Sequence, residues 1–484
     1  MSDIPKKNIL MAAILLTGTF ITILNQTLMI TALPPIMNEF NITENTAQWL
    51  TTVFMLVNGI MIPISAFLIE KFTTRQLFMT AMMTFIIGTI ISGLSDSFGL
   101  LITGRVIQSA GAGIMIPLMQ TVFLLIFPVE RRGTVMGFVG LTISFAPALG
   151  PSVSGYITEF YDWRVLFWAV LPLILLITIF AWFVLENVTE QKNPKVDPVS
   201  IIMSSFGFGG LLYGFTSAGN NGWTAPITLL TLGASGIILF LFIRRQLAMI
   251  HPMLEFRVFR LRTFTIATII GMIGFLGLIG METLIPLYMQ EMRDFTPLES
   301  GLALLPGALI SGFMSPLTGY IFDKIGARKL AFTGLTIMTI ATAAFVFVDI
   351  YATITLLALL FAIRMFGFSM VMMPVTTSAL NELPKKVIPH GAAMNNTMRQ
   401  IAASVGTALL VTIMTTTAQQ VQTDSPDTTP DIIGMNAAML VIALLTFIGL
   451  LLAFFLKETT PMSDEEWDAN EGRAPGMEAP DQRQ

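Results

Sequence analysis

The sequence predicts an all-α integral membrane protein with fourteen transmembrane helices. Of the 484 residues, 54% are hydrophobic and only 12% are charged, about half the charged fraction of an ordinary globular domain. So few charges cannot cover a soluble protein of this length, so most of the surface must face lipid. Strands of about ten alternating residues, typical of membrane β-barrels, are not seen. The apolar runs, each near or above the ~20 residues that cross a bilayer, lie at 9–33, 46–69, 77–95, 98–127, 133–158, 165–185, 199–218, 226–243, 263–290, 298–322, 329–348, 352–380, 388–418 and 433–456.

The distribution of basic residues predicts that both termini lie in the cytoplasm. Cytoplasmic loops of membrane proteins carry an excess of Lys and Arg. With the N-terminus inside, only Arg164 and Arg293 of the 26 Lys and Arg residues fall in outer loops, while Arg105, Arg364 and Arg399 fall within spans. A missed or invented span would exchange the two sides from that point on, so the number of spans should be even.

The first run follows Lys6 and Lys7, as the apolar core of a signal peptide would. It is longer than the usual signal core of roughly 7–15 residues, and the other runs follow it. We therefore expect it to be a retained span.

Two pairs of similar segments indicate an internal repeat of six spans. The segment 66–75 recurs as 319–328, with an acid, a base and an Arg in register. Arg105 recurs as Arg364 at nearly the same offset. Both pairs of similar segments lie where short inner loops join spans, which favours duplication of a six-span unit.

This repeat divides the chain into two bundles, an insertion and a tail. The polar stretch from Glu186 to Pro198 is expected to lead from the first bundle into two extra central spans. After Lys457 the chain becomes acidic and contains Pro and Gly, so a disordered cytoplasmic tail is expected. The predicted parts are an N-terminal six-span bundle at 1–190, a linker with two extra spans at 191–250, a C-terminal six-span bundle at 251–456 and the tail at 457–484.

Glu282 is the only acidic residue well inside an apolar run. A charge at membrane depth costs at least about 2.5–3.5 kcal/mol, so Glu282 should face a polar cavity or a partner. Burial disfavours its charged form and a nearby Arg favours it. A carboxylate poised between these effects can take a proton from one side and release it to the other, so Glu282 is predicted to carry a coupled proton. A solvated residue at the outer rim and a structural ion pair are the alternatives.

Three arginines, Arg105, Arg364 and Arg399, also lie at membrane depth. If all of them face the cavity with Glu282, its formal charge is +2. If the chain is a transporter, such a charge is unexpected for a carrier of organic cations, so neutral, zwitterionic or anionic amphiphiles should be at least as good substrates. The predicted cavity residues are Asn25, Gln108, Glu282, Arg364, Asn395, Asn396 and Arg399.

Several functional classes are disfavoured. The net charge of −4 argues against nucleic acid as a partner. No Gly-x-x-x-x-Gly-Lys segment is present to hold ATP. The chain has no cysteine, and its only histidines, His251 and His390, lie in inner loops without a ligand cluster, so no metal or other cofactor and no enzymatic activity are expected. If the chain is a transporter, an ion gradient would then drive it, and we expect a monomer.

Three segments resemble signatures of the fourteen-span drug:proton antiporters of the major facilitator superfamily. They are LNQTLMITALPP at 24–35, TAQWLTT at 46–52 and DWRVLFW at 162–168. The resemblance covers essentially the whole chain and is greatest to the lincomycin-resistance exporters of Gram-positive bacteria. It implies a major facilitator fold in a bacterial plasma membrane, with two six-helix bundles and two extra central helices. It also implies proton-coupled export of small amphiphilic drugs or antibiotics by alternating access.

The resemblance further implies a hinge in the fifth span. Small residues let helices approach closely, and Pro removes a helical hydrogen bond. The residues that match the antiporter motif are Gly137, Ala146, Gly150, Pro151, Ser154 and Gly155.

An inner gate and a proton-coupling residue are implied in the same way. In the gate, a carboxylate at the end of a span would pair with Arg across the bundle interface. Arg105, followed by Gln108, is similar to the family motif linked to proton coupling and would tune or partner Glu282, although Asn25 stands where many relatives have Asp. The gate residues are Glu70, Lys71, Arg75, Asp323, Lys324, Gly326 and Arg328.

Two other functions stay open. The substrate could be physiological, such as a lipid precursor, a bile acid or a signalling metabolite. A membrane sensor or channel without coupled transport is the other alternative, and it conflicts with the hinge motif and the repeated gates.

Overall fold

The computed structural model describes residues 4–192, 196–424, 429–457 and 461–470, and within these residues it contains helices and no strand. Fourteen helices have 19 or more residues, and six elements are shorter. The long helices are α1 (Lys6–Phe40), α3 (Trp49–Lys71), α4 (Thr74–Gly93), α5 (Phe98–Ile126), α6 (Arg132–Phe160), α7 (Val165–Val184), α8 (Pro198–Asn221), α9 (Pro226–Ala248), α10 (Arg262–Leu287), α11 (Pro297–Ile325), α12 (Ala327–Phe345), α13 (Ile354–Asn381), α14 (Ile388–Asp424) and α15 (Pro430–Ala453). The short elements are α2 (Glu44–Ala47), η1 (Val129–Arg131), η2 (Phe256–Arg260), the π-helical turn η3 (Tyr288–Met292), η4 (Lys385–Val387) and α16 (Asp464–Asn470).

Each predicted run corresponds to one long helix, which confirms the all-helical membrane class. Thirteen of the helices are long and apolar enough to cross a membrane. The exception is α12, because Arg328 and Lys329 lie in its first turn and lower its hydropathy. That α12 also spans the membrane, and that both termini are cytoplasmic, stay predictions.

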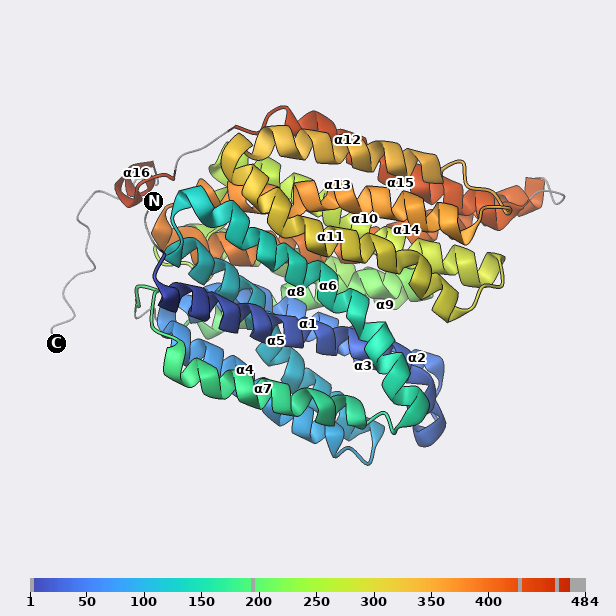
Figure 1. Cartoon of the computed structure of the whole chain (residues 1–484), viewed down its shortest axis with the longest axis horizontal. Coiled ribbons are helices and arrows are strands. Elements are labelled where there is room, and N and C mark those ends of the chain that lie inside the picture. The colour runs from blue at the N-terminus through green and yellow to red at the C-terminus, as the bar shows by residue number, and fades with distance from the viewer. Residues whose placement is uncertain (1–3, 193–195, 425–428, 458–460, 471–484) are drawn as a thin grey trace.

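The long helices form two bundles (Figure 1). In the first bundle α4 packs against α5 and α7, α3 packs against α5, and α1 packs against α6. In the second bundle α12 packs against α13 and α15, and α10 packs against α14 and α13. The beginning of α1 and helix α16 lie at the same end of the molecule, which we call the inner end, and the opposite end is the outer end.

The bundles meet mainly through α6 and α11, which lie side by side near the inner end and diverge toward the outer end (Figure 1). A Cβ atom added to Gly133 would lie only 2.6 Å from the carbonyl oxygen of Gly319, so the two backbones are in close contact. Nearer the outer end, the rings of Phe145 and Phe313 are 5.7 Å apart. Beyond these rings, a Cβ atom on Gly155 of α6 would meet no atom within 4 Å. The interface is therefore closed at its inner half.

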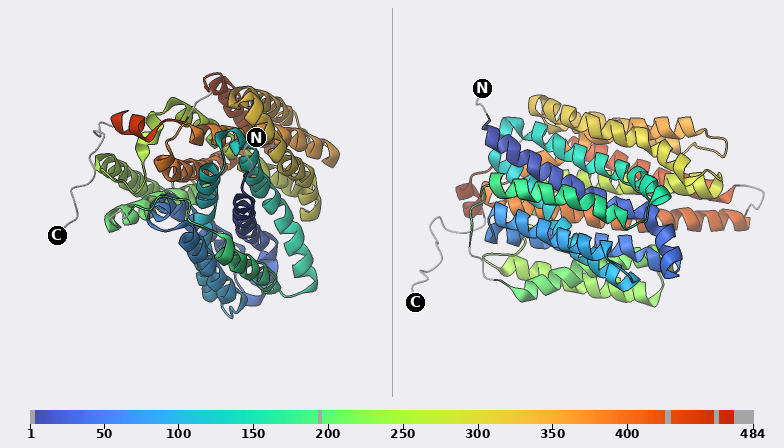
Figure 2. Two further views of the ribbon diagram at one scale, coloured as in Figure 1. Left: turned by 60° about the vertical axis from the view of Figure 1, so that its left-hand side comes forward. Right: turned by 60° about the horizontal axis from the view of Figure 1, so that its bottom comes forward.

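The two extra helices cover the other seam between the bundles. Helix α8 packs against both α3 and α14, whereas α9 packs mainly against α8 (Figure 2). The ring of Tyr213 on α8 stacks on Trp49 of α3, with centroids 6.0 Å apart. Just after α8, Trp223 Nε1 donates to Thr412 Oγ1 of α14 at 2.7 Å. The inserted pair is thus central in the sequence and peripheral in the fold.

The chain end differs from the disordered tail that was predicted. Residues 464–470 form helix α16, and its Trp467 is only 2% exposed. Residues 458–460 and 471–484 lie outside the described residues. Composition alone therefore missed a docked helix.

Candidate functional site

Arg105 of α5 lies at the centre of a polar cluster inside the first bundle. Its guanidinium is fully buried and donates through Nη1 to Asn25 Oδ1 at 2.7 Å and to Gln108 Oε1 at 3.0 Å. Gln108 Nε2 in turn donates to Thr89 Oγ1 at 2.8 Å. The ring of Phe54 lies 4.2 Å from the guanidinium carbon. The cluster therefore ties α1, α3, α4 and α5 together through neutral partners. The amide oxygen of Asn25 accepts the hydrogen bond that the carboxylate of an Asp would accept at this position.

Arg364 of α13 is the most weakly paired arginine at membrane depth. It is fully buried, and its Nε donates to Thr342 Oγ1 at 3.2 Å. Nη1 and Nη2 have no hydrogen-bond partner among the described residues. A Cβ atom on Gly277 of α10 would lie 2.5 Å from Nη2, so this glycine makes room for the guanidinium.

Glu282 of α10 is exposed, and the described part of the structure gives it no hydrogen bond or ion pair. Ile273, nine residues earlier and so on the opposite side of the helix, lies 3.6 Å from the backbone-built Cβ of Gly449 on α15. Glu282 therefore points away from α15, a helix whose own neighbours all belong to the second bundle. It lies in the outer half of α10, and Arg105, its predicted partner, is enclosed in the other bundle.

Arg399 and its neighbours on α14 lie at membrane depth, and one of these neighbours connects the two bundles. Arg399 is 3% exposed and donates through Nη2 to Asn396 Oδ1. Asn396 Nδ2 donates to Gln120 Oε1 of α5 at 2.7 Å, across the bundle interface. Asn395 Nδ2 donates to Thr268 Oγ1 of α10 at 3.2 Å. The predicted cavity included Gln108 but missed Gln120, the second amide side chain of the same apolar span.

The accessible charge differs from the formal sum of +2. The guanidinium groups of Arg105, Arg364 and Arg399 are at most 3% exposed, whereas Glu282 is exposed. In this conformation the three arginines are enclosed by protein, whereas protein does not cover Glu282. The expected preference for neutral, zwitterionic or anionic substrates stays a prediction, but the charge count no longer supports it in this conformation.

Asp323, a predicted gate residue at the end of α11, makes contacts between the two bundles. Its Oδ1 accepts from the backbone N–H of Gly133 at 2.7 Å, and its Oδ2 accepts from the N–H and the hydroxyl of Thr134 at 2.8 and 2.6 Å. These donors form the first turn of α6, where the helix dipole is positive. The expected pairing with Arg is wrong for Asp323. Backbone N–H groups in the first turn of α6, which have no partner within their own helix, donate to its carboxylate instead.

Glu70, the predicted gate acid at the end of α3, also makes a contact between the bundles. Its Oε1 lies 2.6 Å from Lys192 Nζ and 3.2 Å from His390 Nε2, on α14 of the opposite bundle. His390 Nδ1 accepts from the backbone N–H of Glu255 at 3.3 Å. Here too Arg is not the partner. His390 lacked a ligand cluster in the sequence, so its role was missed.

The basic residues of the predicted gate stay within their own bundles. Arg75 Nε donates to the carbonyl of Leu185 at 2.7 Å. Lys71 lies over Phe67, and Lys324 lies 4.3 Å from the ring centroid of Tyr320. The structure gives Arg328 no contact across the interface among the described residues. Gly326, with φ of 78°, allows the sharp turn from α11 into α12.

Gly137 and Gly150 of the predicted hinge face two neighbours of α6, whereas a Cβ atom on Gly155 would meet no atom within 4 Å. A Cβ atom on Gly137 would lie 2.7 Å from the Cα of Pro316 on α11. Gly150 is equally close to Thr27 of α1. Ala146 and Ser154 are fully buried, and Pro151 lies within the unbroken helix. The motif therefore permits close packing on both sides, and bending at this place stays a prediction.

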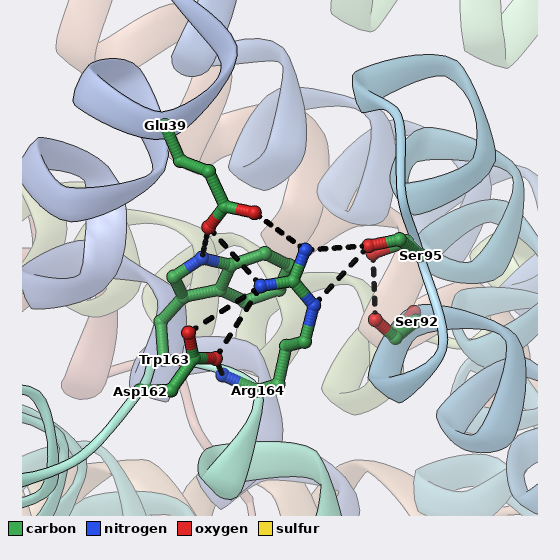
Figure 3. A network of polar contacts seen from close by, with 6 residues as sticks. All are labelled: Glu39, Ser92, Ser95, Asp162, Trp163 and Arg164. Carbon is green, nitrogen blue, oxygen red and sulfur yellow. Dashed lines mark hydrogen bonds and ion pairs between the residues drawn. The ribbon is translucent and has the colours of Figure 1, made fainter.

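A polar network at the outer end of the first bundle explains the DWR segment (Figure 3). Arg164 Nη2 lies 2.6 Å from Glu39 Oε1 and donates to the carbonyl of Ser95 at 2.8 Å. Trp163 Nε1 donates to Glu39 Oε2 at 2.6 Å. The hydrogen bond from Arg164 lowers the pKa of Glu39, with a further lowering by the bond from Trp163. The network fixes the outer end of α1 to the α4–α5 and α6–α7 loops.

Among the described residues, no three His, Asp or Glu side chains are grouped so that they could hold a metal ion. The predicted absence of a cofactor is not tested by this observation.

Comparison with known proteins gives consistent matches. The family described as Major Facilitator Superfamily matches residues 15–407. The Uncharacterized MFS-type transporter YcnB of Bacillus subtilis (strain 168) is 49% identical over 96% of this chain and 98% of its own length. The Lincomycin resistance protein LmrB of the same organism is 39% identical over 93% of this chain and 95% of its length. The solved structure of the human organic anion transporter MFSD10 has a TM-score of 0.67 at 12% identity, covering 92% of this chain and 99% of that one, and supports the fold alone.

Proposed function

The chain belongs to the major facilitator superfamily, and from this premise we propose that it exports small amphiphilic drugs or antibiotics in exchange for protons. It is a multi-pass transporter of the bacterial plasma membrane and not an enzyme. Similarity to a lincomycin resistance protein over nearly the whole chain supports a drug as the substrate. Proton exchange and the precise substrate are the proposed parts.

Glu282 is the observation that carries proton coupling. It is an exposed carboxylate in the outer half of α10 without an ion pair among the described residues, and Arg364 lies in the same bundle with two unpaired amino groups. An exposed acid can be protonated from outside. Once it is charged and enclosed, its carboxylate would need a cation or a drug as a partner, because an unpaired charge at membrane depth is unfavourable.

The contacts between bundles support alternating access. The described contacts between α6 and α11 hold the inner half closed, while Glu282 stays accessible. In the proposed cycle, proton uptake at Glu282 releases drug outward and allows the outer halves to close. Breakage of the Glu70 and Asp323 contacts then opens the inner end, where the proton leaves and a new drug binds.

The first prediction is that Glu282→Gln abolishes drug-driven proton release. The amide keeps the size of the side chain but cannot exchange a proton at neutral pH. The measurement is the internal pH of proteoliposomes after addition of lincomycin-like or dye substrates, with Glu159→Gln, an exposed acid at the outer end of α6, as the matched control.

Unchanged coupling in Glu282→Gln would exclude this carrier and direct attention to Glu70, Glu291 and Asp323. If no drug drives proton release in the wild type, while a deletion strain accumulates a cellular amphiphile, the physiological substrate would be the better assignment. Saturable flux that depends on protons would contradict the sensor or channel alternative.

A further inference from the structure

A cavity of about 240 Å³ lies at the inner end, where several separate segments meet. Glu70 and His390 line this cavity together with Trp467 of α16, so the tail helix and the predicted gate border the same cavity. Its lining includes Glu70, Lys192, His251, Glu255, Lys386, His390 and Trp467.

Helix α16 is built to hold its shape although it has only seven residues. Ser463 Oγ accepts from the backbone N–H of Glu466 at 3.1 Å, and Glu466 Oε2 accepts from the N–H of Ser463 at 3.0 Å. This reciprocal capping box satisfies donors at the start of the helix. Trp467 follows directly and is 2% exposed, so the helix presents one large apolar side chain to the inner face.

Several polar contacts attach the tail to the α13–α14 loop. Lys386 Nζ lies 2.6 Å from Asp468 Oδ2 and donates to the carbonyl of Asp464 at 3.1 Å. The backbone N–H of Met462 donates to the carbonyl of Glu382 at 3.4 Å. The tail therefore binds both ends of the loop that lies between α13 and α14.

The same loop leads into the residue that closes the gate. His390 lies four residues after Lys386, in the first turn of α14, and its Nε2 is 3.2 Å from Glu70 of the opposite bundle. Opening of the inner end must separate Glu70 from His390. A helix that fixes the preceding loop and packs Trp467 beside them makes that separation more costly.

We propose that α16 is an internal latch that stabilises the closed inner face by holding the α13–α14 loop. The proposal rests on the alternating access of the proposed function. Release of the latch opens the inner end more often, so the tail sets the rate at which the carrier presents its site to the cytoplasm.

The test measures distance between the bundles instead of transport. The chain has no cysteine, so nitroxide labels at Phe72→Cys, between α3 and α4, and at Lys329→Cys, in the first turn of α12, report the inner end alone. Double electron–electron resonance in nanodiscs would compare the wild type with Trp467→Ala and Asp468→Asn. Glu465→Gln removes a charge from an exposed position of the same helix and is the matched control.

We expect the separated population to rise roughly tenfold in Trp467→Ala, because a buried aromatic contact is lost. In Asp468→Asn it should rise about two- to fivefold, because a partly exposed ion pair is lost. Lys386→Asp should raise it as well, and adding Asp468→Lys should return it toward the wild type. Glu465→Gln should leave it unchanged.

Wild-type distances in both Trp467→Ala and Asp468→Asn would overturn the latch, and so would an equal effect of Glu465→Gln. Drug-driven proton release on the same proteins reports the proposed function separately. Its absence in the wild type would contradict proton exchange, while the distance changes would still decide whether α16 holds the loop.

Discussion

Arg105, Arg364 and Arg399 show how differently one residue type is held at membrane depth. A charge there costs at least about 2.5–3.5 kcal/mol unless polar groups surround it. Arg105 has amide partners and the face of Phe54, whereas Arg364 has one hydroxyl partner and two unpaired amino groups. The sequence revealed all three charges. It could not reveal these environments, because the partners are neutral side chains on other helices.

Glu39 leads to a prediction about pH. Its pKa in the folded protein is lowered by Arg164, so the bond adds stability at pH values above the unfolded pKa of about 4.5 and loses it as the pH falls through the lower folded value. The Tm difference between the wild type and Glu39→Gln should be constant from pH 7 to about 5 and shrink below 4.5. A difference that grows with acidification would contradict this assignment. Glu44→Gln, on the same outer face, is the control.

At the scale of elements, helix N-termini form the partners of both gate acids. The repeat places Glu70 and Asp323 in register at the ends of α3 and α11. The structure places each against the first turn of a helix in the other bundle, α14 and α6 respectively. The two contacts are therefore related by the same repeat. One of them uses a histidine side chain and the other uses backbone N–H groups.

The contact between α6 and α11 predicts the effect of a single methyl group. Gly319→Ala would place its Cβ atom 2.8 Å from the carbonyl carbon of Gly133, so the backbones must separate. Overpacking of this kind costs about 1–3 kcal/mol and should favour the open inner end. A single cysteine at Ser315 should react faster with a thiol reagent added from the inner side.

Gly301→Ala provides the control on the same helix, because an added Cβ atom there meets nothing within 4 Å. Its labelling rate at Ser315→Cys should equal that of the parent. Equal rates in Gly319→Ala and Gly301→Ala would show that the close backbone contact does not limit inner opening.

The elements were predictable to different degrees. Long apolar runs identified every long helix, since a bilayer demands about 20 apolar residues in each. The ends were less accurate: α1 extends to Phe40 and α14 to Asp424, because polar residues continue a helix beyond the lipid. Helix α16 was missed although Ser463 and Glu466 have the spacing of a capping box. The acidic composition of the segment led to a prediction of disorder, and this local capping pattern was not considered.

At the scale of the whole molecule, the closed inner half predicts that one crosslink stops the cycle. Ser144 Oγ on α6 and Ser311 Oγ on α11 are 3.1 Å apart. Cysteines at both positions can form a disulfide, whose sulfur atoms lie about 2.05 Å apart. Oxidation should reduce drug export to background, because the bundles can no longer separate there, and a reductant should restore it.

The matched control joins two helices of the inserted pair. Ser217 Oγ on α8 and Thr228 Oγ1 on α9 are 2.8 Å apart, so Ser217→Cys with Thr228→Cys should also crosslink. This bond lies outside the interface of α6 with α11 and should leave export unchanged. Continued export with the Ser144–Ser311 pair fully oxidised would contradict alternating movement of the two bundles at this seam.

Helix α8 has a consequence for lateral entry from the bilayer. Because α8 contacts both α3 and α14, protein covers the seam between those helices. At the other seam, α13 contacts both α6 and α11, but α13 belongs to the second bundle and is not an added helix. A molecule dissolved among the acyl chains therefore cannot approach the interior between α3 and α14 without first passing the inserted pair.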